Sequence, residues 1–173
     1  MISAIVAVDN NFGIGNKNNL LVHIPEDMKM FKKITTNNIV VMGRKTYDSL
    51  PNKPLSDRIN FVVTTNPSKF IGQHNPYNLF YFNMEAIKNW LSQNKVKQDN
   101  DIYIIGGGQI YNELLPFCER VYLTKIFHSY ENVDTYFPNI DNLYEWEATH
   151  SSDIKTYKNI KYQFYIYDKV RKV

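Results

Sequence analysis

Short apolar runs with β-branched or aromatic residues alternate with stretches of helical spacing along most of this 173-residue chain. The runs predict buried strands at residues 2–8, 39–42, 59–64, 79–82, 102–105 and 121–127. The stretches between them predict helices at residues 25–35, 44–49, 84–96 and 108–115, the last one stopped by Pro116. Strands that alternate with helices indicate a largely parallel sheet covered on both faces.

The pattern changes near the C-terminus. Residues 146–150 and 160–170 alternate between apolar and polar positions and predict two strands joined by the polar segment 151–159. This indicates an antiparallel hairpin at the edge of the sheet. The length fits one domain, residues 1–173, so the expected fold class is α/β: a mostly parallel mixed sheet, the hairpin and about four helices. The loops at 9–23 and 66–78 are candidates for functional segments.

The composition is that of an ordinary soluble globular protein, with 43% hydrophobic and 21% charged residues. The net charge of +3 helps to attract a small anionic molecule, but the basic residues are dispersed, which argues against a nucleic-acid partner. A lone cysteine, Cys118, excludes an internal disulfide and suits a reducing cytosol. The four histidines lack metal-ligand spacing, so no metal is expected. No run is long enough to span a membrane, and we expect a cytoplasmic protein.

Asp27 stands out because it is an acid on the apolar face of the predicted helix 25–35. With about 100° between successive residues, that face carries Ile24, Met28, Met30, Phe31 and Ile34. A carboxylate among apolar neighbours is paired or has its pKa raised, and such acids concentrate at functional sites. The alternative is structural: Pro25, Glu26 and Asp27 also fit an N-terminal turn whose acids complement the helix dipole.

Two predicted strands run directly into glycine and the start of a helix, at residues 43–46 and 106–108. Glycine lets backbone N–H groups approach an anion, and the helix N-terminus adds a partial positive charge. Neither junction is a Walker loop or a Gly-x-Gly-x-x-Gly motif, and the glycine triplet alone also fits a tight turn. Two such junctions favour a ligand with separated phosphates, such as a dinucleotide. Thr64 and Thr65 either serve a further phosphate or simply end a strand.

Taken in order, these motifs resemble those of dihydrofolate reductase over nearly the whole chain. The segments that carry the resemblance are Val6-Ala7-Val8-Asp9, Gly13-Ile14-Gly15, Ile24-Pro25-Glu26-Asp27 with Phe31-Lys32, Met42-Gly43-Arg44-Lys45-Thr46, Leu55 with Arg58, Ile104-Ile105-Gly106-Gly107-Gly108-Gln109-Ile110-Tyr111, Tyr122-Leu123-Thr124-Lys125-Ile126 and Asp134-Thr135-Tyr136-Phe137-Pro138. Each motif is modest alone, whereas the ordered set is specific.

The resemblance implies NADPH-dependent reduction of 7,8-dihydrofolate to 5,6,7,8-tetrahydrofolate, which supports one-carbon metabolism and thymidylate synthesis. Asp27 matches the family's ionisable active-site residue, which would grip the pterin and, with a raised pKa, promote its protonation through a water. Thr124 matches the threonine that hydrogen-bonds this acid. Asp27 and Thr124 are therefore the expected catalytic residues.

The resemblance also implies an apolar substrate pocket. Its expected walls are Ile5, Val6, Met28, Phe31, Leu50, Leu55 and Ile105. Core packing alone is the alternative explanation for most of these residues. Arg58 would bind the α-carboxylate of the glutamate tail through two parallel hydrogen bonds, and Lys32 would lie near the outer end of that tail.

For the cofactor, the resemblance implies three groups of contacts. Ala7, Ile14, Gly15 and Tyr111 would approach the nicotinamide. Gly43, Thr46, Gly106, Gly107, Gly108, Gln109 and Ile110 would surround the diphosphate. Arg44, Lys45, Thr64 and Thr65 would surround the 2′-phosphate, which favours NADPH over NADH. The segment 10–20 would be the mobile flap of the family, which closes over the nicotinamide.

The chain departs from the family at residues 20–23, which read Leu-Leu-Val-His where the family has Leu-Pro-Trp before the helix. Val22 lacks the indole N–H that holds a water in the family, and His23 either compensates or is an exposed loop histidine. Two alternatives stay open: a related NADPH-dependent reductase of riboflavin synthesis, against which Asp27 and Arg58 count, and a non-catalytic NADPH-binding protein. We expect a free-standing monomer that binds dihydrofolate and antifolate inhibitors.

Overall fold

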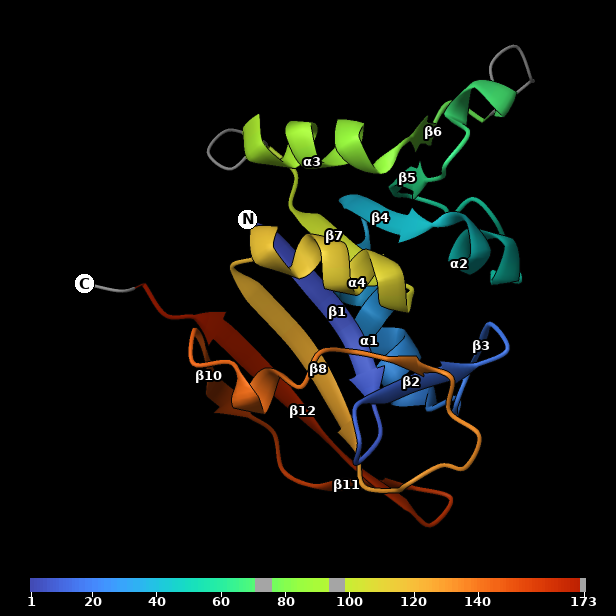
Figure 1. Ribbon diagram of the computed structural model, residues 1–173. Coiled ribbons are helices and arrows are strands. Elements are labelled where there is room, and N and C mark those ends of the chain that lie inside the picture. The colour runs from blue at the N-terminus through green and yellow to red at the C-terminus, as the bar shows by residue number, and fades with distance from the viewer. Residues whose placement is uncertain (71–75, 94–98, 172–173) are drawn as a thin grey trace.

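The computed structural model describes residues 1–70, 76–93 and 99–171 (Figure 1). The strands of the main sheet are β1 (Ile2–Val8), β4 (Ile39–Gly43), β5 (Ile59–Val63), β6 (Leu79–Phe82), β7 (Ile102–Gly106), β8 (Arg120–Ile126), β10 (Trp146–Ser151), β11 (Lys155–Tyr157) and β12 (Ile160–Lys169). Their order is β10-β12-β8-β1-β7-β4-β5-β6, with β11 paired to β12. The strands from β8 to β6 run parallel, whereas β12 and β10 are antiparallel to their neighbours. The predicted α/β class and the C-terminal hairpin are confirmed.

The helices are α1 (Pro25–Thr35), α2 (Arg44–Ser49), α3 (Met84–Gln93) and α4 (Gly108–Leu114). Short 3₁₀ turns lie at Pro67–Phe70, Leu115–Phe117 and Ile140–Asn142. The bounds of α1 and α2 were predicted correctly, and α1 begins at a proline because the first turn needs no N–H partner there. The predicted end of α3, residues 94–96, lies outside the described residues.

A second, three-stranded sheet was not predicted. It consists of β2 (Gly13–Asn16), β3 (Asn19–Leu20) and β9 (Thr135–Tyr136) in the order β3-β2-β9. Its strands are too short to show an alternating pattern, and β2 and β3 lie in the predicted loop 9–23. Lys17 and Asn18 join them with φ values of 49° and 62°, as in a two-residue hairpin turn.

Alternate side chains of the central strands enter separate cores. Even-numbered residues of β1 pack with α3 and α4, in a core that includes Ile87, Leu91 and Leu114. Odd-numbered residues such as Ile5 and Ala7 face the side that carries α1 and α2. Because β1, β4, β5 and β7 are parallel, their carboxyl ends meet at one edge of the sheet. The glycine junctions after β4 and β7 are thereby brought together.

The hairpin contains a strand that the sequence pattern did not reveal. The predicted connection 151–159 includes β11, which turns back onto β12 through Lys158 and Asn159, both with positive φ. Strand β10 carries a bulge between Ala148 and His150 where it pairs with β12. The hairpin contacts the first turn of α1, where Tyr162 and Lys155 both bind Glu26.

Candidate active site

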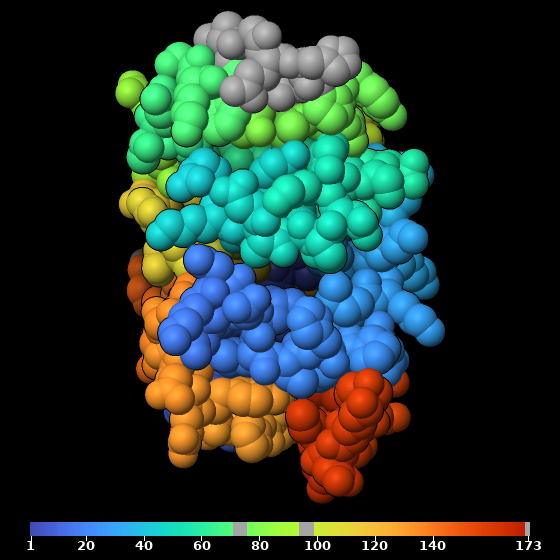
Figure 2. Space-filling model, turned by 90° about the vertical axis from the view of Figure 1, so that its right-hand side faces the viewer, coloured from blue at the N-terminus to red at the C-terminus, as the bar shows by residue number. Residues whose placement is uncertain are grey.

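A cleft opens at the carboxyl edge of the sheet. Figure 2 shows it as a hollow between the cyan and teal atoms of α2 and the segment after it, above, and the blue atoms of β2, β3 and α1, below. The dark blue floor belongs to β1. Ile5 and Ala7 of β1 face this side of the sheet.

The Asp27 carboxyl group is held by a hydrogen bond from the neighbouring sheet. The Thr124 hydroxyl of β8 donates to Asp27 Oδ1 at 2.5 Å. Thr124 is buried and Asp27 is half-buried. The two residues predicted as a catalytic pair are therefore in direct contact, although 97 positions separate them in the chain.

Burial raises the pKa of Asp27 above its ordinary value of 3.8, and the hydrogen bond from Thr124 opposes this rise. Desolvation is the larger effect because the apolar face of α1 removes water from the carboxylate. The carboxyl group is thus poised to accept and release a proton closer to neutral pH than a solvated aspartate.

The other acid of this turn, Glu26, points to the C-terminal hairpin. Its carboxylate accepts a hydrogen bond from the Tyr162 hydroxyl at 2.5 Å and lies 3.2 Å from Lys155 Nζ. These contacts lower the pKa of Glu26, with Tyr162 as the larger cause. The pKa values of the two neighbouring acids are therefore shifted in opposite directions. A favourable interaction with the helix dipole would lower both, so it does not account for Asp27.

Arg58 is buried at the far end of α1, with 7% of its surface exposed. Its Nε donates to the Ser56 carbonyl at 2.8 Å and its Nη1 donates to Thr35 Oγ1 at 3.1 Å. The guanidinium lies 6.0 Å from the centre of the Phe31 ring. These contacts orient the group, and its other N–H donors have no protein acceptor among the described residues. Burial lowers the pKa of Arg58.

The predicted pocket residues divide into three sets. Ile5, Leu50, Leu55 and Ile105 pack in one partly buried cluster on the α1 side of the sheet. Met28 and Lys32 are exposed along the outer rim of α1. Val6 points the other way, into the core under α4, because successive side chains of β1 alternate between faces. Its side chain is not part of the apolar wall.

The two glycine junctions lie against each other. A Cβ atom on Gly107 would approach Thr46 Oγ1 to 3.2 Å, and one on Gly43 would approach Ile110 Cγ1 to 3.0 Å. Gly106 has a φ of +108°, and a Cβ there would lie 2.9 Å from the Tyr111 ring. The backbone is therefore bare where α2 and α4 begin, as a diphosphate cradle requires. A phosphate-bearing cofactor fits this surface.

The cations predicted for the 2′-phosphate lie at this edge. Arg44 and Lys45 are exposed at the start of α2, and Arg44 pairs with Asp48 at 2.9 Å. Thr64 is buried and follows β5, whereas Thr65 is exposed. Gln109 is exposed in the first turn of α4.

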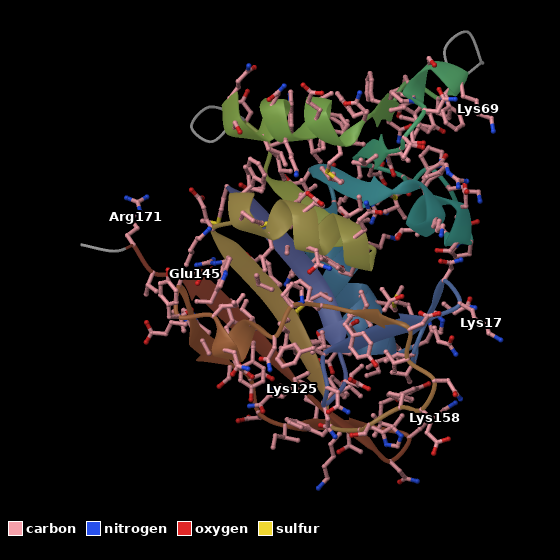
Figure 3. The ribbon with its side chains drawn as sticks, viewed as in Figure 1. Lys17, Lys69, Lys125, Glu145, Lys158 and Arg171 are labelled. Atoms are coloured by element: carbon pink, nitrogen blue, oxygen red, sulfur yellow. The ribbon has the colours of Figure 1, made fainter. Side chains whose placement is uncertain are left out.

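The flap of residues 10–20 is tied to the rest of the molecule by two aspartates. Buried Asp9 accepts backbone N–H groups of Asn11 and Gly13 through Oδ1, and of Tyr130 through Oδ2. Asp134 accepts the backbone N–H of Lys17 at 2.9 Å. The Lys17 side chain itself points outward (Figure 3).

Two of the residues predicted near the nicotinamide, Ile14 and Gly15, lie within this flap. The Ile14 side chain is buried in the core under α4, next to Gly15 in β2. Tyr111 is buried as well, and its hydroxyl donates to the Ile5 carbonyl at 2.7 Å. Val22 packs against the cluster of Ile24, Ile126 and Tyr162, while His23 is exposed.

Several supporting residues were missed by the sequence reasoning. Asn60, fully buried, bonds to both the N–H and the carbonyl of Leu55, and Asn78 bonds to the carbonyls of Leu55 and Arg58. These amides fix the segment that carries Arg58. Asp9 belongs to the motif Val6-Ala7-Val8-Asp9, but no role was predicted for it. An acid directly after a predicted buried strand was the signal that could have indicated one.

In the part of the chain that the structure describes, no helix is both long and apolar enough to cross a membrane.

Comparison with known proteins gives consistent results. A family model described as dihydrofolate reductase matches residues 1–169. The dihydrofolate reductase of Bacillus subtilis (strain 168) is 38% identical over 172 residues, which cover 98% of this chain and 95% of that protein. That of Buchnera aphidicola subsp. Baizongia pistaciae (strain Bp) is 35% identical over 171 residues, covering 99% and 97%. A solved dihydrofolate reductase from Enterococcus faecalis, complexed with NADP(H) and RAB-propyl, matches with a TM-score of 0.80, 29% identity and coverage of 98% and 96%.

Proposed function

The chain belongs to the dihydrofolate reductase family, and from this we propose which of its residues carry the reaction. It catalyses the NADPH-dependent reduction of dihydrofolate to tetrahydrofolate. We propose that Asp27 governs protonation of the pterin and that Thr124 fixes its orientation. The observation that carries this proposal is the half-buried carboxyl group with a raised pKa and a 2.5 Å bond from Thr124.

At the pterin end, Asp27 accepts hydrogen bonds from the amino and ring N–H groups of the substrate. A carboxylate suits this pair of donors because its two oxygens accept in one plane. The raised pKa makes Asp27 hold a proton more tightly than a solvated aspartate, and a water passes a proton to the ring nitrogen beside the reduced carbon. Ile5, Phe31, Leu50 and Leu55 exclude other water from the ring.

At the tail end, Arg58 binds the α-carboxylate of the glutamate. Its Nε and Nη1 are already held by Ser56 and Thr35, which leaves donors of the fork for the ligand. Burial strengthens the attraction between guanidinium and carboxylate because little water screens it. Lys32 and Met28 border the same rim.

NADPH supplies the hydride when it is bound. The bare backbone at residues 106–108 and Thr46 would hold its diphosphate, and Arg44 and Lys45 would attract the 2′-phosphate. Ala7, Ile14 and Gly15 would border the nicotinamide, and the flap would exclude water from it. The φ of Gly106 and the close approach of Thr46 to Gly107 support this assignment.

We further propose that residues 1–173 act as one domain and as a monomer in the cytoplasm. The monomer is supported by the cleft, to which a single chain contributes Asp27, Arg58 and both glycine junctions. A reducing compartment is supported by the buried thiol of Cys118. The apolar cleft with a half-buried acid also suits antifolate inhibitors. Size-exclusion chromatography tests the oligomeric state.

The test uses Asp27→Asn with Asp153→Asn as the matched control, because Asp153 is exposed in the hairpin, away from the cleft. Single-turnover oxidation of NADPH by dihydrofolate is followed as a function of pH. Asp27→Asn is expected to bind NADPH normally, to react slowly near neutral pH and to lose the pH dependence. A wild-type rate and pH profile in Asp27→Asn would remove the acid from the mechanism.

A further inference from the structure

A cavity of about 420 Å³ lies under helix α1, on the side of the C-terminal hairpin. Its lining comes from α1, β1, β8 and the segment from β10 to β12. Among the described lining residues, none belongs to α2, to residues 50–58 or to the glycine junctions. In Figure 2 the red hairpin lies below α1 and the cleft lies above the same helix. We call this space, which ends at Asp27 and Thr124, the rear cavity.

Asp27 lines the rear cavity together with Ile5, Phe31 and Thr124, residues that we also place at the substrate site, so the cavity adjoins that site at the Asp27 carboxyl group. Oδ1 is occupied by the Thr124 hydroxyl, whereas Oδ2 has no donor among the described residues and is not fully buried. A substrate that fills the cleft covers the carboxyl group from one side, so the cavity is the remaining approach to it.

The shape and lining of the rear cavity suit water. Met30, Ile34, Phe164 and Ile166 form apolar walls, and a strictly apolar space of this size would stay dry. Here carboxyl, hydroxyl and ammonium groups also belong to the lining, and polar partners are the condition for ordered water. The volume is far above the roughly 10–15 Å³ that one ordered water needs.

The mouth of the rear cavity is charged. Glu26 and Lys155 line it and form an ion pair at 3.2 Å, and His150, Ser151 and Ser152 complete the rim. The Tyr162 hydroxyl holds Glu26 at 2.5 Å, which keeps this carboxylate at the mouth. His150 and Ser151 are exposed whereas Thr124 is buried, so the cavity lies between solvent and the Asp27–Thr124 pair.

We propose that the rear cavity hydrates Asp27 and exchanges its proton with solvent while the substrate fills the cleft. This inference rests on the proposed role of Asp27. The reaction takes up one proton with each hydride. Along the water chain each molecule gives one proton and receives another, so the chain is unchanged and the net proton comes from bulk solvent. The O–H bond formed on Asp27 breaks when the ring nitrogen is protonated.

Other ionisable groups line the rear cavity beside Asp27 or interact with its charge. Those in the lining are Glu26 on α1, Tyr122 on β8, His150 on β10, Lys155 on β11 and Tyr165 on β12, and those that interact with its charge are Tyr162 on β12 and Tyr111 on α4. The pKa of Tyr162 is raised to about 12, first by burial and then by the hydrogen bond to Glu26. Burial, and then the charge of Asp27, also raises the pKa of Tyr111. Both phenols therefore keep their protons across the pH range of the assay.

The test fills the rear cavity from α1. Met30→Trp adds a bulky apolar side chain inside the cavity, and Met30→Leu is the control that leaves it open. The pH midpoint is measured twice: from single-turnover hydride transfer, which reports the occupied enzyme, and from kcat/KM, which reports the free enzyme. Ile166→Phe fills the cavity from β12 and serves as a second variant, should Met30→Trp not fold.

We expect the filled variants to raise the midpoint of hydride transfer by about one pH unit, because the carboxylate loses its remaining water. The midpoint of kcat/KM should stay unchanged, since the empty cleft still hydrates Asp27, and Met30→Leu should match the wild type in both. Equal midpoints in wild type and filled variants, or equal shifts of both midpoints, would overturn the proposal. Asp27→Asn separates the two ideas: a wild-type pH profile in that variant defeats the role of Asp27 itself, whatever the cavity does.

Discussion

Replacing Thr124 by valine removes the hydrogen bond to Asp27 and keeps the shape of the side chain. The Thr124 hydroxyl donates to Oδ1 at 2.5 Å and opposes the rise of the Asp27 pKa caused by burial. Without this donor the ionised carboxylate is less stable, so the pKa of Asp27 should rise further. The pH midpoint of hydride transfer should rise with it.

The size of the effect follows from the strength of the lost bond. A hydrogen bond to a charged group contributes about 1.5–3 kcal/mol, and about 1.4 kcal/mol corresponds to one pKa unit. Asp27 is half-buried, so water replaces part of the lost bond. We therefore expect a rise of about one pH unit. Thr124→Ser, which keeps a hydroxyl group, should shift the midpoint much less.

Stopped-flow measurement of hydride transfer across the pH range tests this prediction, and urea unfolding provides a second readout. A group whose pKa is raised in the folded state contributes stability that is lost as pH rises through that pKa. Thr124→Val should therefore lower the free energy of unfolding more at neutral pH than at acidic pH. A midpoint that is unchanged or lower in Thr124→Val, with Thr124→Ser as in wild type, would refute the reasoning.

Three further predictions concern the rest of the site. Arg58→Lys loses the planar fork and should raise KM for dihydrofolate about tenfold or more with kcat nearly unchanged; steady-state kinetics with an unchanged KM would contradict this. Gly106→Ala places a Cβ 2.9 Å from the Tyr111 ring at a φ of +108°, so it should lower the free energy of unfolding by about 1–3 kcal/mol and weaken NADPH binding. Fluorescence titration measures the binding, and wild-type affinity would count against a diphosphate site at residues 106–108. Asp9→Ala leaves three backbone N–H groups without their acceptor and should destabilise the fold by about 3 kcal/mol or more, while the pH midpoint of hydride transfer stays fixed. Calorimetry at constant pH measures the stability, and an unchanged stability would contradict this role of Asp9.

Local signals account for the parts of the fold that the sequence predicted well. Helix α1 was predicted with its observed bounds because Pro25 marks its start and its apolar spacing continues to Thr35. Strands β1 and β6 were likewise predicted with their observed bounds, although only Leu79 of β6 is buried. Strands of two to four residues, such as β2, β3, β9 and β11, are too short to carry a period, and pairing with distant segments defines them.

The sequence predicted a site residue where its type was unusual for its position in a helix or strand. It could not predict a contact between residues that are far apart in the chain. Asp27 was visible as an acid on an apolar face, whereas its contact with Thr124 came from the resemblance. The roles of Asp9 and Asn60 depend on backbone groups that only the fold brings near them. Val6 was misplaced because a sequence motif does not distinguish the two faces of β1.

The central claim is that this one carboxyl group holds a proton more tightly than an ordinary aspartate. Carbon-13 NMR of the Asp27 carboxyl group, assigned by comparison with Asp27→Asn, measures its titration directly. The account predicts a midpoint clearly above the ordinary 3.8. A midpoint at or below that value would contradict it.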